Sequence, residues 1–134
     1  MERLQKNPPP QPPNNPINRK MKILHLTLTR RWFKMILSGE KREEYREIKP
    51  YWTTRLKYRY ESDRESGYWN HDFAEFDIVR FKNGYAKDAP TMDVQLECIK
   101  VATGVPAWGA VLNERYYAIE LGNIISTANC DNLT

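Results

Sequence analysis

The sequence predicts an α+β fold that is mainly β: a small, mostly antiparallel β-barrel or curled sheet with one or two short helices packed on it. Three observations support this fold class. The chain has 134 residues, of which 40% are hydrophobic, so it can form one hydrophobic core but not two. Apolar residues recur at helical spacing only in its first half. Alternating apolar and polar residues, which are typical of strands, dominate its second half.

Composition divides the chain into three regions. Residues 1–20 contain six of the nine prolines, and they cannot bury enough apolar surface to offset the entropy lost on ordering. We therefore predict a disordered Pro/Asn-rich segment at 1–20, one folded domain at 21–125 and a flexible C-terminal tail at 126–134.

The folded region is predicted to begin with a strand, a short helix and a glycine turn. Residues 22–29 alternate, with three leucines on one face: Leu24, Leu26 and Leu28. Thr29 can cap a helix. Four apolar residues then recur at helical spacing: Trp32, Phe33, Ile36 and Leu37. Gly39 supplies the left-handed residue that commonly ends a helix.

A second strand and a second helix are expected next. Residues 43–48 are predicted as a strand, in which Glu44 and Arg46 share a face because side chains two residues apart point the same way. Pro50 can start a short helix, and we assign Trp52 to the core. The mixed-charge stretch 61–72 is predicted to be a surface loop.

Three strands are predicted in the second half, at 76–82, 92–101 and 116–121. The first two are separated by the turn-rich segment 83–90, which opens with an Asn-Gly pair.

The net charge of +4 is unevenly distributed. Residues 21–60 carry 11 Lys/Arg and four Glu, whereas residues 61–134 carry six Lys/Arg and 12 Asp/Glu. A local excess of cations favours an anionic partner such as a nucleic acid, although runs of charge are often only solvated surface.

The segment 39–46 is the strongest candidate for function, because both of its faces are polar where a core strand would alternate. Its pattern, Gly39-x-Lys41-x-x-Glu44-x-Arg46 after a strand and a helix, resembles the signature of the ASCH domain, and the resemblance covers about residues 21–125. ASCH domains have a β-barrel similar to the PUA fold. The resemblance therefore implies a PUA-like barrel that binds RNA, or a modified nucleoside or nucleotide, in a polar cleft lined by this signature.

A second function is implied by one bacterial branch of the family, which hydrolyses N4-acetylcytidine with a Lys, a Thr and a later Glu. The resemblance places that lysine at Lys41, but this chain has Glu44 where the branch has Thr. Glu97 is one candidate for the later glutamate. The alternative function is therefore an amidohydrolase acting on N4-acylated cytidine-type nucleosides, with Lys41 and Glu44 as candidate catalytic residues.

The chemistry of the signature favours binding over hydrolysis. A carboxylate between two cations stays ionised and is a weak base, so Glu44 is better suited to accept a hydrogen bond from a base. Arg46 can donate to a ring carbonyl or a phosphate. Lys41 can stabilise an oxyanion, or act as a base if burial beside Arg46 lowers its pKa. The alternative is a surface ion pair between Glu44 and Arg46 with no ligand.

Three residues around the Asn-Gly turn are further ligand-binding candidates: Arg80, Asn83 and Tyr85. They are expected to overhang the cleft from the opposite strand, and a plain hairpin turn is the alternative.

The sequence contains no pattern that indicates a metal, a cofactor or a membrane. Cys98 and Cys130 lack paired spacing and are predicted to be free thiols. No His/Cys/carboxylate cluster has metal-ligand spacing, so we expect no metal and no cofactor. The chain has neither a span of about 18 apolar residues nor a signal-peptide pattern, and we expect a cytoplasmic protein.

Overall fold

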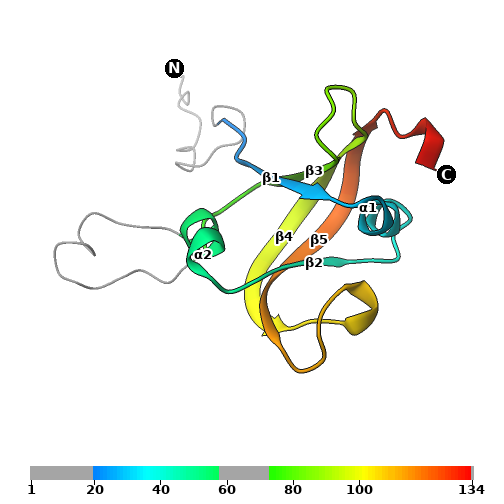
Figure 1. Cartoon of the computed structure of the whole chain (residues 1–134). Helices are drawn as coiled ribbons and strands as arrows, with labels where there is room; N and C mark the ends of the chain where they lie inside the picture. Colours follow the sequence, from blue (N-terminus) through cyan, green and yellow to red (C-terminus); the bar gives the residue numbers. More distant parts are fainter. Residues whose placement is uncertain (1–19, 58–72, 134) are drawn as a thin grey trace, which may run out of the picture.

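The computed structural model of the chain describes residues 20–57 and 73–133. In this part of the chain, two α-helices accompany a five-stranded mixed sheet, and most of the regular structure is strand (Figure 1). The predicted α+β, mainly β class is therefore confirmed. Two predictions lie outside the described residues: the surface loop at 61–72 and nearly all of the N-terminal segment.

The sheet is open, with a short strand at each edge. Its strands follow the order β1 (Ile23–Leu28), β3 (Ile78–Asn83), β4 (Thr91–Thr103), β5 (Arg115–Ala128) and β2 (Glu43–Arg46). β1 runs parallel to β3, and the other three pairs are antiparallel. Among the described residues no ladder joins β1 to β2, so closure of the sheet into a barrel is not confirmed.

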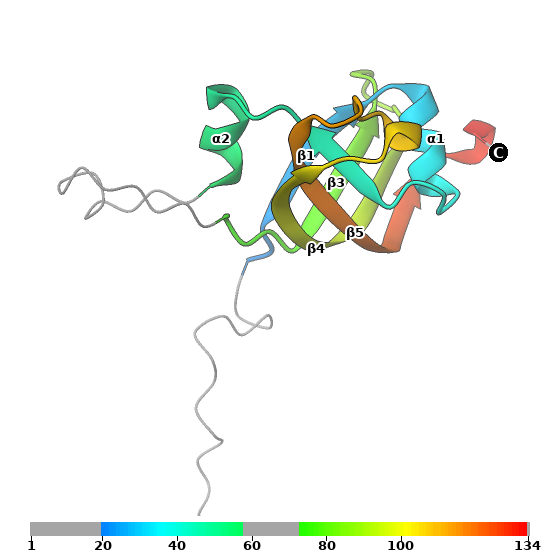
Figure 2. The same ribbon diagram turned by 90° about the horizontal axis from the view of Figure 1, so that it is seen from below.

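The two helices lie at opposite ends of the sheet, as both ribbon views show (Figures 1 and 2). α1 spans Arg30–Leu37, and its cap is Thr29 as predicted, although the Thr29 side chain makes no capping hydrogen bond. The Thr29 carbonyl instead accepts from Phe33 N at 3.0 Å. Gly39 follows α1 with φ +87°, the left-handed conformation that glycine adopts most readily. α2 spans Pro50–Leu56 and begins at Pro50, as predicted.

The hydrophobic core lies between α1 and the inner face of the sheet. It contains the three β1 leucines, Phe33 and Ile36 of α1, and apolar residues of β3, β4 and β5. Trp52 of α2 is partly buried and packs against this core, in agreement with its assignment.

The C-terminal end differs from the predicted flexible tail. β5 continues to Ala128, where it pairs with Thr91 of β4. The chain then forms a 3-10 helix, Asp131–Leu133, whose Leu133 is only 3% exposed and belongs to the core. Residues 123–129 are all exposed, so this end of the chain has no alternation of apolar and polar residues that would predict a strand. Backbone pairing with β4, rather than a buried face, positions the end of β5.

Candidate functional site

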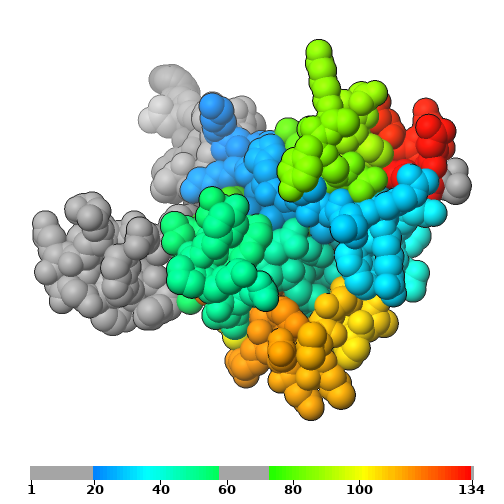
Figure 3. Space-filling view, viewed as in Figure 1, coloured from blue at the N-terminus to red at the C-terminus, as the bar shows by residue number. Residues whose placement is uncertain are grey.

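The signature occupies the turn after α1 and the edge strand β2, which is shorter than predicted and ends at Arg46. In the space-filling view this segment crosses the visible face between α2 and α1, with β1 above it and the loop before β5 below (Figure 3). Two backbone contacts place it: Lys41 N donates to Met35 O of α1 at 3.0 Å, and Glu44 pairs with Ile119 of β5. The helix end and the sheet therefore set the position of the signature side chains.

Lys41 is a fully buried cation, with 2% of its surface exposed. Its ammonium donates to Glu43 O at 2.5 Å and to Trp108 O at 2.8 Å, and it lies 3.2 Å from Glu44 Oε1. These three acceptors match the three N–H donors of an ammonium group. The Trp32 and Tyr45 rings lie 5.4 and 4.9 Å from the Lys41 nitrogen, so this charge is enclosed by carbonyls, one carboxylate and aromatic faces.

Burial lowers the pKa of Lys41, because desolvation disfavours its charged form, while the Glu44 carboxylate acts in the opposite direction. The neighbouring Arg46 adds a further lowering. The condition under which Lys41 could act as a base, a lowered pKa, is thus met in direction, and desolvation rather than Arg46 is its main cause.

Glu44 joins the two cations of the signature. It is 5% exposed, with Oε1 facing Lys41 and Oε2 2.7 Å from Arg46 Nη1. The sharing of one face by Glu44 and Arg46 is thus as predicted. The Glu44–Arg46 ion pair of the alternative is therefore present, but its carboxylate is buried rather than exposed to solvent.

Arg46 is the member of the row that reaches the surface, with 18% of its side chain exposed. Its Nη2 donates to Thr27 O of β1 at 3.3 Å, and its guanidinium carbon lies 5.1 Å from the centre of the Trp52 ring. Arg46 therefore spans the two edge strands that no ladder joins. Its Nε is buried and has no hydrogen-bond partner among the described residues.

Tyr45 ties the signature to the loop between β4 and β5. Its hydroxyl donates to Glu43 Oε1 at 2.8 Å and accepts from Val105 N at 2.9 Å. Burial, with the nearby Glu43, raises the pKa of Tyr45. Sequence reasoning missed this support and the Trp108 carbonyl, because a backbone acceptor contributed by a distant loop leaves no signal in the residue pattern.

The other predicted ligand-binding residues lie apart from this row in the described contacts. Arg80 forms a bidentate pair with Asp93, at 2.7 and 2.9 Å, and Asn83 donates to Leu28 O at 3.0 Å. Tyr85 is 87% exposed in the loop after β3. The structure thus brings together Lys41, Glu44 and Arg46 and does not bring Arg80, Asn83 or Tyr85 to them.

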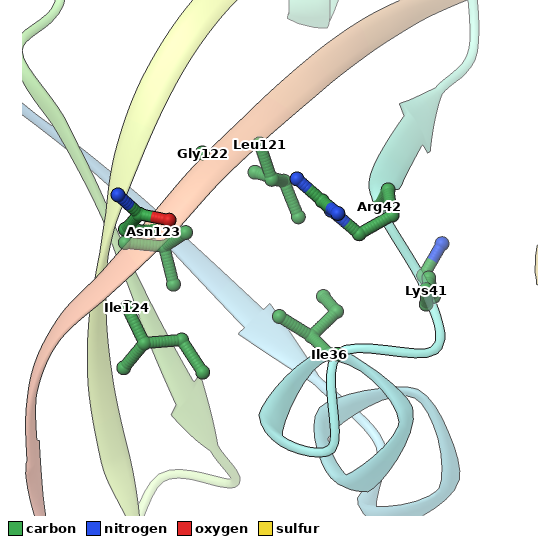
Figure 4. A pocket seen from close by; sticks show the side chains of 9 residues that line it. Ile36, Lys41, Arg42, Leu121, Gly122, Asn123 and Ile124 are labelled. Carbon is green, nitrogen blue, oxygen red and sulfur yellow. The ribbon is translucent and has the colours of Figure 1, made fainter.

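Two neighbouring cavities lie beside the signature and share Arg42. The first, of about 200 Å³, is lined by Gly39, Lys41, Arg42 and residues of β5. Figure 4 shows the Arg42 guanidinium extending across this cavity toward Leu121, whereas the Lys41 ammonium points away from it. The second, of about 410 Å³, is acidic and contains Glu97. Neither of these two cavities is lined by Glu44 or Arg46, so the cavity that contains Glu97 does not include the signature row.

The described residues hold no group of three or more His, Cys, Asp or Glu side chains that could bind a metal ion. Both cysteines are free thiols, as predicted. No helix in the described part of the chain is long and apolar enough to cross a membrane.

Comparison with known proteins gave no match: no family model, no curated protein and no solved structure is similar to this chain. Function is therefore inferred from the residues and their geometry.

Proposed function

We propose that this protein is an ASCH-type domain of PUA-like architecture that binds single-stranded RNA, or a nucleoside or nucleotide, at the outer end of its signature. Arg46 is the contacting residue, and Lys41 and Glu44 are positioning residues behind it. The signature order, the open curled sheet and the cationic excess of residues 21–60 all support this proposal.

One observation carries the proposal. Arg46 Nε is a buried donor without a partner among the described residues, and leaving such a donor unpaired costs about 1–3 kcal/mol. Buried donors are nearly always paired, so an exception requires a reason. Less than 1 Å² of this nitrogen is exposed, so a carbonyl or phosphate oxygen of a ligand reaches it after the Arg46 side chain shifts. The planar guanidinium that covers the Trp52 ring is itself a surface on which a base can stack.

The preformed contacts of Glu44 suit this division of roles. Its two carboxylate oxygens face one cation each, which fixes the Arg46 guanidinium before any ligand arrives. Preorganised contacts reduce the entropy lost on binding. In this arrangement Glu44 acts through Arg46 rather than by reading a base directly.

Hydrolysis of N4-acylated cytidine is not proposed as a second function. A lysine base needs a free lone pair, but all three Lys41 donors face acceptors inside the protein. The lowered pKa of Lys41 is the one feature that suits a base. Incubation with N4-acetylcytidine checks this point, and release of cytidine that depends on Lys41 would restore the alternative.

The experiment replaces Arg46 with methionine, which keeps the stem and removes the guanidinium. Binding of a fluorescent, mixed-sequence 12-nucleotide single-stranded RNA is measured by anisotropy, and binding of cytidine by calorimetry. We expect Arg46→Met to weaken RNA binding about tenfold or more, because a charge-assisted hydrogen bond contributes about 1.5–3 kcal/mol.

Arg31→Met is the matched control. Arg31 also lies over a tryptophan, 4.4 Å from the Trp32 ring centre, but it is more exposed than Arg46 and lies outside the signature. Circular dichroism verifies that both variants remain folded. If Arg46→Met binds RNA as tightly as the unmodified protein, Arg46 is not part of the site. If Arg46→Met and Arg31→Met lose the same affinity, the loss comes from the lower net charge of the protein.

A further inference from the structure

A third cavity, on the outer face of β1 and β3, differs from the first two in its chemistry. It has a volume of about 330 Å³ and is bounded by β1, β3, β4 and the loop 84–90. Its lining includes a histidine, three other basic residues and two threonines: His25, Arg80, Lys82, Lys87, Thr27 and Thr91. No carboxylate is among the described residues that line it.

Strand register explains why these side chains converge. Thr27 of β1 lies opposite Lys82 of β3, and Lys82 lies opposite Thr91 of β4. Residues in register on neighbouring strands lie about 5 Å apart and share a face. They therefore form one row of hydroxyl, ammonium and hydroxyl across three strands, and Lys87 joins it from the loop.

The charge of this cavity is largely uncompensated. Arg80 is held by Asp93 through two hydrogen bonds, but neither Lys82 nor Lys87 has an ion-pair partner within residues 20–57 and 73–133. The cavity of similar size beside the signature is lined by three glutamates and one arginine. These two cavities thus differ in the sign of the charge that lines them.

We propose that this cavity is a phosphate-binding site, in which Lys82 and Lys87 supply the positive charge and the Thr27 hydroxyl supplies a hydrogen bond, whereas the Thr91 hydroxyl donates to Ala89 O at 3.1 Å. Lysine binds phosphate as a point charge, and hydroxyl groups are common phosphate donors in nucleic-acid complexes. A volume of about 330 Å³ is at the lower end of small-ligand pockets and accommodates a phosphate with its sugar.

One residue of β1, Thr27, contacts both Arg46 and the cavity, so the two lie side by side. The Thr27 carbonyl accepts from Arg46 Nη2 at 3.3 Å, while Thr27 also lines the basic cavity. A chain with a base at Arg46 and Trp52 can therefore place a neighbouring phosphate in the cavity. The identification of the phosphate carrier as single-stranded RNA rests on the proposed function, whereas the phosphate chemistry does not.

The test uses the full chain and a double variant, Lys82→Gln with Lys87→Gln. Affinity for the mixed-sequence 12-nucleotide RNA is measured at several salt concentrations. Each phosphate contact with a single strand contributes about 0.7 to the slope of log K against log salt, so the double variant should reduce the slope by about 1.4 if both lysines contact phosphate. Cytidine, which has no phosphate, should bind the double variant and the unmodified protein equally.

Lys34→Gln with Arg115→Gln is the matched control, because it removes the same charge from two exposed positions that do not line the cavity. An unchanged slope in the Lys82/Lys87 variant, or an equal reduction in the control, would overturn the proposal.

A second arm separates this proposal from the proposed function. If the unmodified protein binds no RNA, inorganic phosphate is titrated and the backbone amide signals of Thr27, Lys82 and Thr91 are followed by NMR. If phosphate shifts these amide signals in the unmodified protein but not in the double variant, the cavity binds phosphate and RNA is not its carrier. Absence of such shifts would overturn the proposal itself.

Discussion

Replacing Glu44 with glutamine tests whether the signature is a buried charge row. The amide keeps the size of the side chain but removes the negative charge between Lys41 and Arg46. The amide oxygen can accept a good hydrogen bond from only one of the two cations, and the amide NH₂ group then faces the other cation. Since Lys41 is almost completely buried, the variant leaves a desolvated ammonium without an anion.

The expected loss in the free energy of unfolding is about 3 kcal/mol. Removing one partner of a buried ion pair typically costs about 3–5 kcal/mol. The lower end applies here because the Lys41 ammonium keeps two carbonyl acceptors, Glu43 O and Trp108 O, and because Arg46 is partly exposed to water.

The loss should also shrink as the pH rises. The Glu44 carboxylate raises the pKa of Lys41 against the lowering by desolvation, so its removal lowers that pKa further. Where the folded pKa of a lysine lies below its unfolded value, the unfolded state binds more protons between the two values. The free energy of unfolding then rises with pH in that window, up to about pH 10.

Urea unfolding followed by tryptophan fluorescence measures the effect, with Trp32 close to the perturbed charge. Glu47→Gln is the control: Glu47 pairs with Lys49 at 2.6 Å, but the side chains are 67% and 54% exposed, and such pairs contribute about 0–1 kcal/mol. A second comparison combines Glu44→Gln with Lys41→Met, which should cost less than the sum of the two single changes. A Glu44→Gln loss no larger than that of Glu47→Gln would refute the argument.

Three further changes test the structure around this row. Tyr45→Phe leaves Val105 N without its acceptor and should cost about 1–3 kcal/mol. Because the folded pKa of Tyr45 is raised, the unmodified protein should lose stability above about pH 10, and urea unfolding at pH 8 and 11 should show a smaller loss in Tyr45→Phe. Leu133→Ala should cost about 2–4 kcal/mol in the same assay, whereas a flexible tail would show no change. Arg80 lowers the pKa of Asp93, so stability should fall as acid protonates Asp93, below about pH 4; acid titration of Asp93→Asn should show a smaller decline.

The sequence predicted the elements whose signals are local. The alternation of leucines in β1, the helical spacing in α1, the left-handed Gly39 and the start of α2 at Pro50 each depend on a few neighbouring residues, and each agrees with the structure. The far end of β5 was missed because its order comes from pairing with β4, a contact between distant segments. Leu133 was missed for the same reason, since a single buried leucine has no periodicity.

The candidate site was predicted in its residues but not in its environment. The sequence placed Glu44 and Arg46 on one face, and Lys41 beside them, from strand geometry and spacing. It could not show that Lys41 is buried, because that burial depends on the Trp108 carbonyl and the Trp32 ring, which come from other parts of the chain. The pairing of Arg80 with Asp93 was not predicted, because the Asn-Gly turn does not reveal which residue of β4 lies opposite Arg80.

The identity of residue 44 influences the pKa of Lys41, and through it the chemistry that this row supports. With a carboxylate 3.2 Å away, the buried ammonium has an anion that opposes the lowering of its pKa by desolvation. A neutral side chain at this position would remove that opposition and favour the free amine that a base requires. Glu44 also compensates part of the charge of Arg46 through Nη1. The row therefore holds its inner charges fixed and leaves part of the Arg46 guanidinium exposed at its outer end, which supports the proposed binding role of Arg46 more than a role of this row in proton transfer.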